Sequence, residues 1–142
     1  DGYVEFHPDA EKRAYLKVAG KYGPGLEHPA ECEVIGYEMP SVENPGFDKE
    51  GKQGPYAMLN IKVKSEEFGL CFVRHFEAIG SFAGSRVPRW LMNLSVPNTG
   101  PPKFGHNPKS VLGLKCGIEV GDPKPGKDGR VFNGSLIDIF GA

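Results

Sequence analysis

The sequence predicts a mainly β fold, in which five strands form a small barrel and one short helix lies between the third and fourth strands. Two observations carry this prediction. The first is the order of the patterns: three strand-like runs, then a short amphipathic stretch, then two further runs joined by a turn. The second is that the 20 Gly and 13 Pro residues form no repeats and lie between the apolar runs, as turn residues do in β-rich domains.

The first two predicted strands are Glu31–Met39 and Tyr56–Lys64, which a long polar connection separates. The first is rich in β-branched and aromatic residues, which favour strands, and Pro40 ends it. The second alternates more clearly, and Ala57, Leu59, Ile61 and Val63 are expected to face the core. Its outward face is expected to consist of Tyr56, Met58, Asn60, Lys62 and Lys64.

The third predicted strand is Leu70–Phe76, and its alternation leaves open which face is buried. A helix is predicted over Arg86–Leu94, because its apolar residues recur at i, i+3, i+4 and i+7. Trp90 lies on this apolar stripe, which indicates core packing. The last two strands are Leu114–Val120 and Arg130–Phe140, and the Asp-Gly pair between them is a strong hairpin signal.

Strand, strand, strand, helix, strand, strand is the chain order of the five-stranded OB barrel, a fold that binds oligonucleotides or oligosaccharides on one face. A chain of 142 residues fits one such domain. Residues 1–28 form a less certain N-terminal extension. Within it, Asp9–Ala19 fits either a short helix, which we favour slightly, or an alternating strand.

The distribution of charge and the cysteines indicate the cellular environment of the protein. Residues 1–54 hold 6 Lys/Arg against 11 Asp/Glu, and residues 55–142 hold 11 against 7, so a net charge of −1 hides a basic second half. The cysteines, Cys32, Cys71 and Cys116, are odd in number, widely spaced and inside strand-like runs, which predicts buried free thiols. This pattern and the lack of a visible signal peptide or membrane span predict a cytoplasmic protein.

The sequence contains no catalytic motif of the common hydrolases, zinc proteases or nucleotide-binding loops, so we expect neither catalysis nor a cofactor. His28 and Cys32 have the i, i+4 spacing of a metal-binding pair, and Cys71 or Cys116 would be needed to complete a site. Cysteines packed in a core explain the same pattern more simply. No metal site is therefore predicted.

Single-strand binders combine cations that follow phosphates with aromatic rings that stack on bases. In an OB barrel the second and third strands and the adjoining loops form that surface. The candidate nucleic-acid-binding residues are Tyr56, Lys62, Lys64, Arg74, His75, Lys103, Phe104, Lys109, Lys124, Lys127 and Arg130. The simpler interpretation of the strand lysines is that they are solvated and protect the sheet from pairing with other chains.

Three segments carry a resemblance: YAMLNIKVKS, SRVPRWLMNLSV and NPKSVLGLKCGIEVGDPKPGKDGRVFNGSLIDI. In this pattern a central strand precedes a short aromatic helix, and a Lys-Asp-Gly-Arg turn leads into the final strand. Over roughly residues 30–140 the chain resembles a largely uncharacterised family of phage and prophage proteins, encoded among replication and recombination genes, that are similar to single-stranded-DNA-binding proteins. The resemblance implies an OB-like barrel that binds single-stranded DNA without catalysis.

A structural or protein-interaction module, such as a particle component or adaptor, is the alternative. The balanced charge, the long Pro- and Gly-rich loops and the absence of catalytic motifs favour it. The expected partners are therefore single-stranded DNA, a second copy of the chain, or a replication or recombination protein. No membrane partner is expected.

Overall fold

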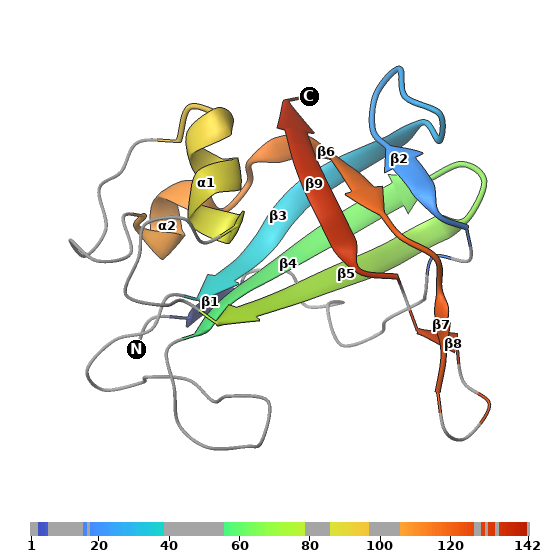
Figure 1. The fold of residues 1–142 in the computed structure, drawn as a ribbon. Helices are drawn as coiled ribbons and strands as arrows, with labels where there is room; N and C mark the ends of the chain where they lie inside the picture. The colour runs from blue at the N-terminus through green and yellow to red at the C-terminus, as the bar shows by residue number, and fades with distance from the viewer. Residues whose placement is uncertain are drawn as a thin grey trace.

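The computed structural model describes residues 3–5, 16, 18–38, 56–78, 86–96, 106–126, 129, 131–132 and 134–141, and most of its strands build one curled antiparallel sheet (Figure 1). In chain order its elements are β1 (Tyr3–Glu5), β2 (Gly20–Tyr22), β3 (Ala30–Glu38), β4 (Tyr56–Ser65), β5 (Gly69–Ala78), α1 (Arg86–Asn93), α2 (Pro108–Val111), β6 (Lys115–Val120), β7 (Lys124–Pro125), β8 (Val131–Phe132) and β9 (Leu136–Gly141).

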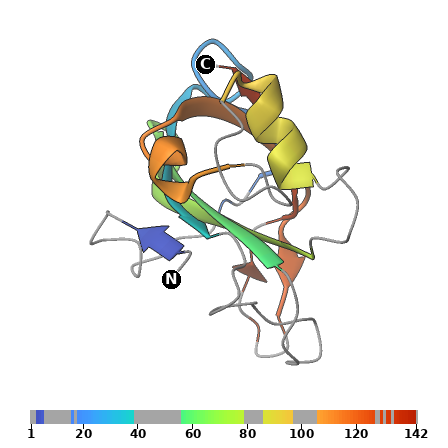
Figure 2. The same ribbon diagram turned by 90° about the vertical axis from the view of Figure 1, so that its left-hand side faces the viewer.

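The sheet is organised around a Greek key. Strands β3, β4 and β5 follow one another as antiparallel neighbours, and β6 returns to pair with the free side of β3. Strand β6 pairs with β9 along its other edge. Strand β2 pairs with β6 on the same edge as β3 does, but farther along the strand. Figure 2 shows the sheet curving into a half-barrel, with α1 beside β9 at its open side.

The mainly β prediction is confirmed, and β3, β4, β5, α1, β6 and β9 follow the predicted order. The predicted number of five strands is wrong, because β1 and β2 bring the main sheet to seven. Both additions are three residues long, which is too short for a periodic signal. The predicted N-terminal helix lies mostly outside the described residues, although Leu16 from that stretch is buried in the core.

The predicted final strand Arg130–Phe140 is divided in the structure. Its first part, β8, pairs with β7 in a separate two-stranded ribbon, and β9 begins only at Leu136. The break comes at Gly134, where an added Cβ would clash with the carbonyl oxygen of Gly121. Only glycine permits such a close approach of two backbones, so the chain changes direction there.

Helix α2 was not predicted, because it lies at the end of a proline-rich stretch interpreted as loop. Asn107 caps it by accepting a hydrogen bond from the Lys109 N–H at 2.9 Å, and Pro108 occupies its first turn.

The core lies on the concave side of the sheet, where β4 contributes Ala57, Leu59, Ile61 and Val63 as predicted. Cross-strand register places Cys71, Val73 and His75 of β5 on this side, which settles the face that the sequence left open. Helix α1 covers part of the core with Val87, Trp90 and Leu91, and this confirms the predicted role of the tryptophan.

The prediction that the other face of β4 is wholly exposed is wrong. Asn60 is fully buried and Met58 nearly so, although both alternate away from the core residues. On that side Phe72 also packs against Ile35, which sits in a β-bulge of β3, as a second small cluster. Alternation predicts the direction of a side chain but not whether another part of the chain covers it.

All three cysteines are buried thiols outside any disulfide, as predicted. Burial raises the pKa of both the Cys32 and the Cys116 thiols to about 12. No helix among the described residues is long and apolar enough to cross a membrane.

Candidate nucleic-acid interface

The register between β4 and β5 brings several of the predicted binding residues onto one surface. On the convex side, Lys62 lies opposite Phe72, Asn60 opposite Arg74, and Met58 opposite Phe76. Lys64 is opposite Leu70 at the end of the same row. We call this surface the convex face of β4 and β5, and among the predicted residues it holds Lys62, Lys64 and Arg74.

Arg74 and Phe76 form the most distinctive pair of this face. The guanidinium carbon of Arg74 lies 5.8 Å from the centroid of the Phe76 ring, within the range of a cation–π contact. Phe76 keeps 59% of its surface exposed, which is unusual for a phenylalanine. Among the described residues the buried Nε of Arg74 has no hydrogen-bond partner. The pair therefore presents a guanidinium, a group that binds oxyanions, beside an exposed ring, a group that can stack on another flat ring.

The two lysines of the convex face lie opposite carboxylates. Lys64 pairs in register with Glu31, and Lys62 with Glu33. Glu33 also forms an ion pair with Lys115 of β6, with 2.5 Å between Oε1 and Nζ, and this hydrogen bond raises the pKa of Lys115. Opposite charges facing each other across strands stabilise the sheet and reduce the field that a polyanion would meet.

His75 does not join this face, because it points to the concave side beside α1. Its Nε2 lies 3.5 Å from Glu77 Oε1, and its ring centroid lies 5.3 Å from that of Trp90. The other carboxylate oxygen of Glu77 accepts a hydrogen bond from the Val87 N–H at 2.9 Å. Burial alone would raise the pKa of Glu77, but the neighbouring His75 ring and the hydrogen bond from the Val87 N–H outweigh it and lower that pKa. The pair therefore anchors the start of α1.

Two of the remaining candidates lie on other elements than Arg74. Lys109 is exposed on α2, and Lys124 on β7 donates a hydrogen bond from Nζ to Ser135 Oγ at 3.5 Å. The backbone of Tyr56 begins β4 opposite Ala78, in the same alternation as Met58 and Asn60. Lys103, Phe104, Lys127 and Arg130 lie outside the described residues.

A group of rings joins the loop before β3 to the turn between β4 and β5. His28 Nδ1 lies 3.1 Å from Glu67 Oε2, and the His28 ring stacks on Tyr22 with centroids 4.6 Å apart. The rings of Phe68 and His28 lie edge to face, with their centroids 5.8 Å apart. Burial, with a contribution from Glu67, raises the pKa of Tyr22 to about 12. The described residues contain no group of three His, Cys, Asp or Glu side chains that could hold a metal ion.

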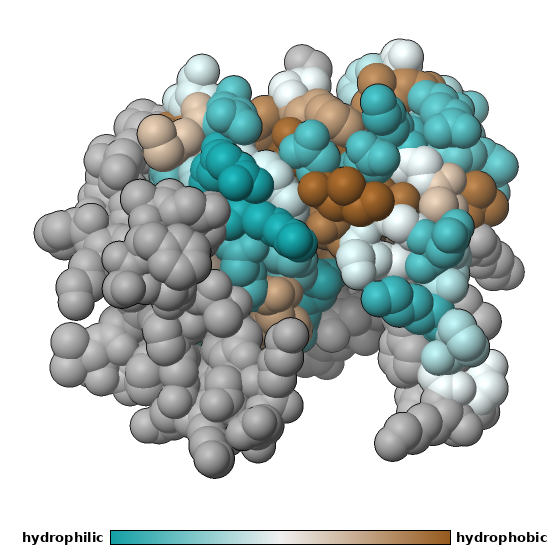
Figure 3. All heavy atoms as spheres, viewed as in Figure 1, coloured by the Kyte–Doolittle hydropathy of each residue, from teal (hydrophilic) through white to brown (hydrophobic). Residues whose placement is uncertain are grey.

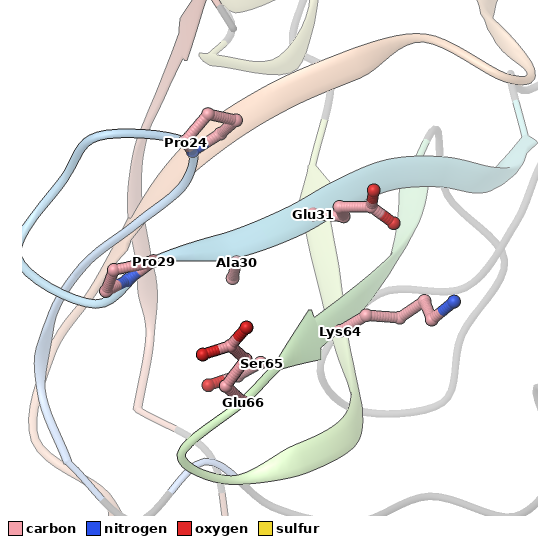
Figure 4. Close-up of a pocket in the computed structure, with 7 residues that line it drawn as sticks. All are labelled: Pro24, Pro29, Ala30, Glu31, Lys64, Ser65 and Glu66. Atoms are coloured by element: carbon pink, nitrogen blue, oxygen red, sulfur yellow. The ribbon is translucent and has the colours of Figure 1, made fainter.

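The same loop, the beginning of β3 and the end of β4 line an open pocket of about 550 Å³ (Figure 4). Its lining residues are Pro24, Pro29, Ala30, Glu31, Lys64, Ser65 and Glu66. The Ser65 hydroxyl accepts hydrogen bonds from the Glu67 and Phe68 N–H groups, so it holds the turn in shape.

Sequence reasoning places Phe76 at the end of the third predicted strand, two residues from Arg74 and so on the same face. It missed the pocket, whose residues carry no sequence signal because they come from a loop, a turn and two strands that only the folded sheet brings together. Comparison of the chain with models of protein families, with curated proteins and with solved structures found no match.

Proposed function

We propose that this protein is a non-catalytic, single-stranded-DNA-binding accessory protein built as an OB-like barrel. The strand order supports the barrel assignment: β6-β3-β4-β5 is a Greek key, β9 extends it beside β6, and α1 lies between the third and fourth of these strands in the chain. The pattern resemblance to phage and prophage proteins suggests a role in replication or recombination, in the cytoplasm of a host cell.

The observation that carries the proposal is the Arg74–Phe76 pair on the convex face. An exposed ring can stack on a base, and the guanidinium beside it can bind the neighbouring phosphate. Lys62 and Lys64 extend the cationic row along β4. These are the second and third strands of the Greek key, which form the binding surface in OB barrels.

The paired charges make the expected binding weak and only moderately salt-dependent. Each phosphate contact on a single strand contributes about 0.7 to the slope of log K against log salt concentration. Three cations, of which two face glutamates, then give a slope of about −2 or smaller in magnitude. A strongly basic groove would give a steeper dependence.

The direct test is fluorescence anisotropy with labelled oligo-dT, at low and at moderate salt. We expect saturable binding at low salt that weakens with the modest slope given above. No binding at low salt would remove the proposed function.

A structural or protein-interaction role is the second candidate, and a specific surface favours it. In the view of Figure 3, hydrophobic side chains gather near the middle of the face, where β9 crosses in front of β6. Ile137 of β9 is 51% exposed. Exposed apolar patches often mark contacts with other proteins or copies of the same chain. A defined oligomer in light scattering, together with no affinity for DNA, would favour this role.

A further inference from the structure

Helix α1 belongs to a long stretch of the chain that has no carboxylate side chains. Residues 78–118 contain no Asp or Glu, although the whole chain has 18 of them. The basic residues of this stretch are Arg86, Arg89, Lys103, Lys109 and Lys115. The stretch supplies α1, α2 and the beginning of β6. The surface of α1 therefore carries uncompensated positive charge, in contrast to the paired charges of β3 and β4.

The two arginines of α1 lie on one side of the helix and are exposed. Arg86 and Arg89 are three residues apart, so their Cβ atoms are neighbours on the helix surface, at roughly 5–6 Å. The buried residues Val87, Trp90 and Leu91 face the core, which directs the arginines toward solvent. Figure 3 shows strongly hydrophilic side chains over α1.

A short series of contacts connects these arginines to the Arg74–Phe76 pair. Glu77 follows Phe76 on β5, and its Oε2 accepts a hydrogen bond from the Val87 N–H at 2.9 Å. Arg86 directly precedes Val87, and its charge helps to lower the pKa of Glu77. Strand β5 ends the strand order of the described sheet, so the convex and concave sides meet at its outer edge. A DNA strand that stacks on Phe76 would therefore pass around this edge onto α1.

We propose that Arg86 and Arg89 bind two further phosphates of the DNA strand that stacks on Phe76, so that the DNA site extends from the convex face of β4 and β5 onto α1. A guanidinium suits this role because its fork of N–H donors matches a phosphate in two-point contact. Glu77 does little to neutralise Arg86, because its two oxygens already face the His75 ring and the first turn of α1. The inference rests on the proposed function and adds a second phosphate-binding element to it.

An acidic segment of a partner protein is the competing ligand, since it would also be attracted to a surface without carboxylates. The neighbouring Phe76 ring favours DNA. Its side chain is 59% exposed, and a base can stack on it, whereas a segment of Asp and Glu side chains offers no flat group to do so.

The test measures the salt dependence of binding by fluorescence anisotropy with labelled oligo-dT. The two lengths are about 4 and about 12 nucleotides, within the range of site sizes for one OB fold, and the longer one reaches both surfaces at once. With the longer one, the slope of log K against log salt concentration should be larger in magnitude by about 1.4 in the wild type than in Arg86→Ala/Arg89→Ala, because two phosphate contacts contribute about 0.7 each. With the shorter one this difference should be smaller.

Four further variants separate lost charge from altered folding. Arg89→Ala alone should reduce the magnitude of the slope by about 0.7, and Arg86→Lys/Arg89→Lys should preserve the slope because both charges remain. Met92→Ala changes an exposed, uncharged side chain of the same helix, and Lys21→Ala removes an exposed cation of β2. Both of these should leave the slope unchanged.

The outcomes separate this inference from the proposed function. Binding of neither oligonucleotide would overturn both. Intact binding with an unchanged slope in Arg86→Ala/Arg89→Ala would overturn the extension onto α1 and leave the DNA-binding function standing. If, in addition, a polyglutamate peptide bound the wild type but not this double variant, the arginines would belong to a site for an acidic protein segment.

Discussion

At the scale of single residues, the cations of the convex face differ in how far they are neutralised. The charged residue opposite Lys64 is Glu31, so the cross-strand row that contains these two residues carries no net charge. Glu33 lies between Lys62 on one side and Lys115 on the other, so one carboxylate serves two ammonium groups and the row keeps a positive charge. Arg74 faces Asn60, which is neutral. We therefore expect Arg74 to attract phosphate most strongly, followed by Lys62 and then Lys64.

The first prediction concerns Arg74 and Phe76. Arg74→Ala should weaken oligo-dT binding and reduce the magnitude of the salt slope by about 0.7, because one phosphate contact is lost. Phe76→Ala should weaken binding by about 1–3 kcal/mol, the value of one stacked base, and leave the slope unchanged. Anisotropy titrations at several salt concentrations measure both effects. Lys21→Ala on β2, an exposed cation outside the candidate set, is the matched control, and an equal loss there would contradict the assignment of the convex face.

The second prediction ranks the lysines. Lys62→Ala should reduce oligo-dT affinity more than Lys64→Ala does, because Lys64 is the one whose charge Glu31 balances. The double variant should flatten the salt slope further. The same titrations decide the order, and an unchanged slope in the double variant would exclude β4 from the interface.

At the scale of elements, helix α1 is held at two places by different forces. Its apolar stripe packs Val87, Trp90 and Leu91 into the core, and its first turn donates a hydrogen bond to a carboxylate of β5. Glu77 can reach that turn because it lies two residues after His75 and, like it, points to the concave side of β5. Loss of such a cap leaves a helix N–H without its partner, at a cost of about 1 kcal/mol.

The third prediction follows from the Glu77 cap. Glu77→Ala should lower the free energy of unfolding by about 1–2 kcal/mol at neutral pH, and Glu77→Gln by less, because an amide oxygen still accepts the Val87 N–H. The folded state lowers the pKa of Glu77, so its contribution is fully present above the unfolded value of about 4.5 and is lost as pH falls through the folded value.

Urea unfolding followed by tryptophan fluorescence at neutral pH and below pH ~4 measures this contribution. The difference between the wild type and Glu77→Gln should shrink on acidification. Glu119→Gln on β6 is the matched control, and a difference that stays constant down to acid pH would show that Glu77 is not held as an ion.

The elements also show what local patterns can and cannot predict. The β4 strand and α1 were predictable because their apolar periodicity is long and regular, and the core side chains follow it. The bulge at Ile35 disturbs the alternation of β3, so its faces were less clear. The division of the last strand at Gly134 depends on contact with Gly121, thirteen residues away, and no window of local sequence contains that contact.

At the scale of the whole molecule, pairing between distant segments creates the candidate site. Glu33 meets Lys115 only because β6 returns beside β3, and the pocket exists only because the loop after β2 folds over the end of β4. Sequence periodicity predicts which way a side chain points, but it does not predict which distant residue will face it. The outward direction of the lysines was therefore predictable, whereas their glutamate partners were not. The same closure buries Cys116 of β6, Cys32 of β3 and Cys71 of β5 in one cross-strand row, with Val63 of β4 between the last two.

The fourth prediction uses these thiols as a probe of the closed fold. Burial raises the pKa of Cys32 and Cys116 to about 12, so almost none of their reactive thiolate is present at neutral pH. In the native protein all three cysteines should therefore react with a disulfide reagent only as fast as the sheet opens, and all three should react promptly in denaturant. Lys109→Cys provides an exposed thiol as control and should react at once. Prompt reaction of a native cysteine would mean that the half-barrel opens without unfolding, and comparison of single Cys→Ala variants would show at which strand it does so.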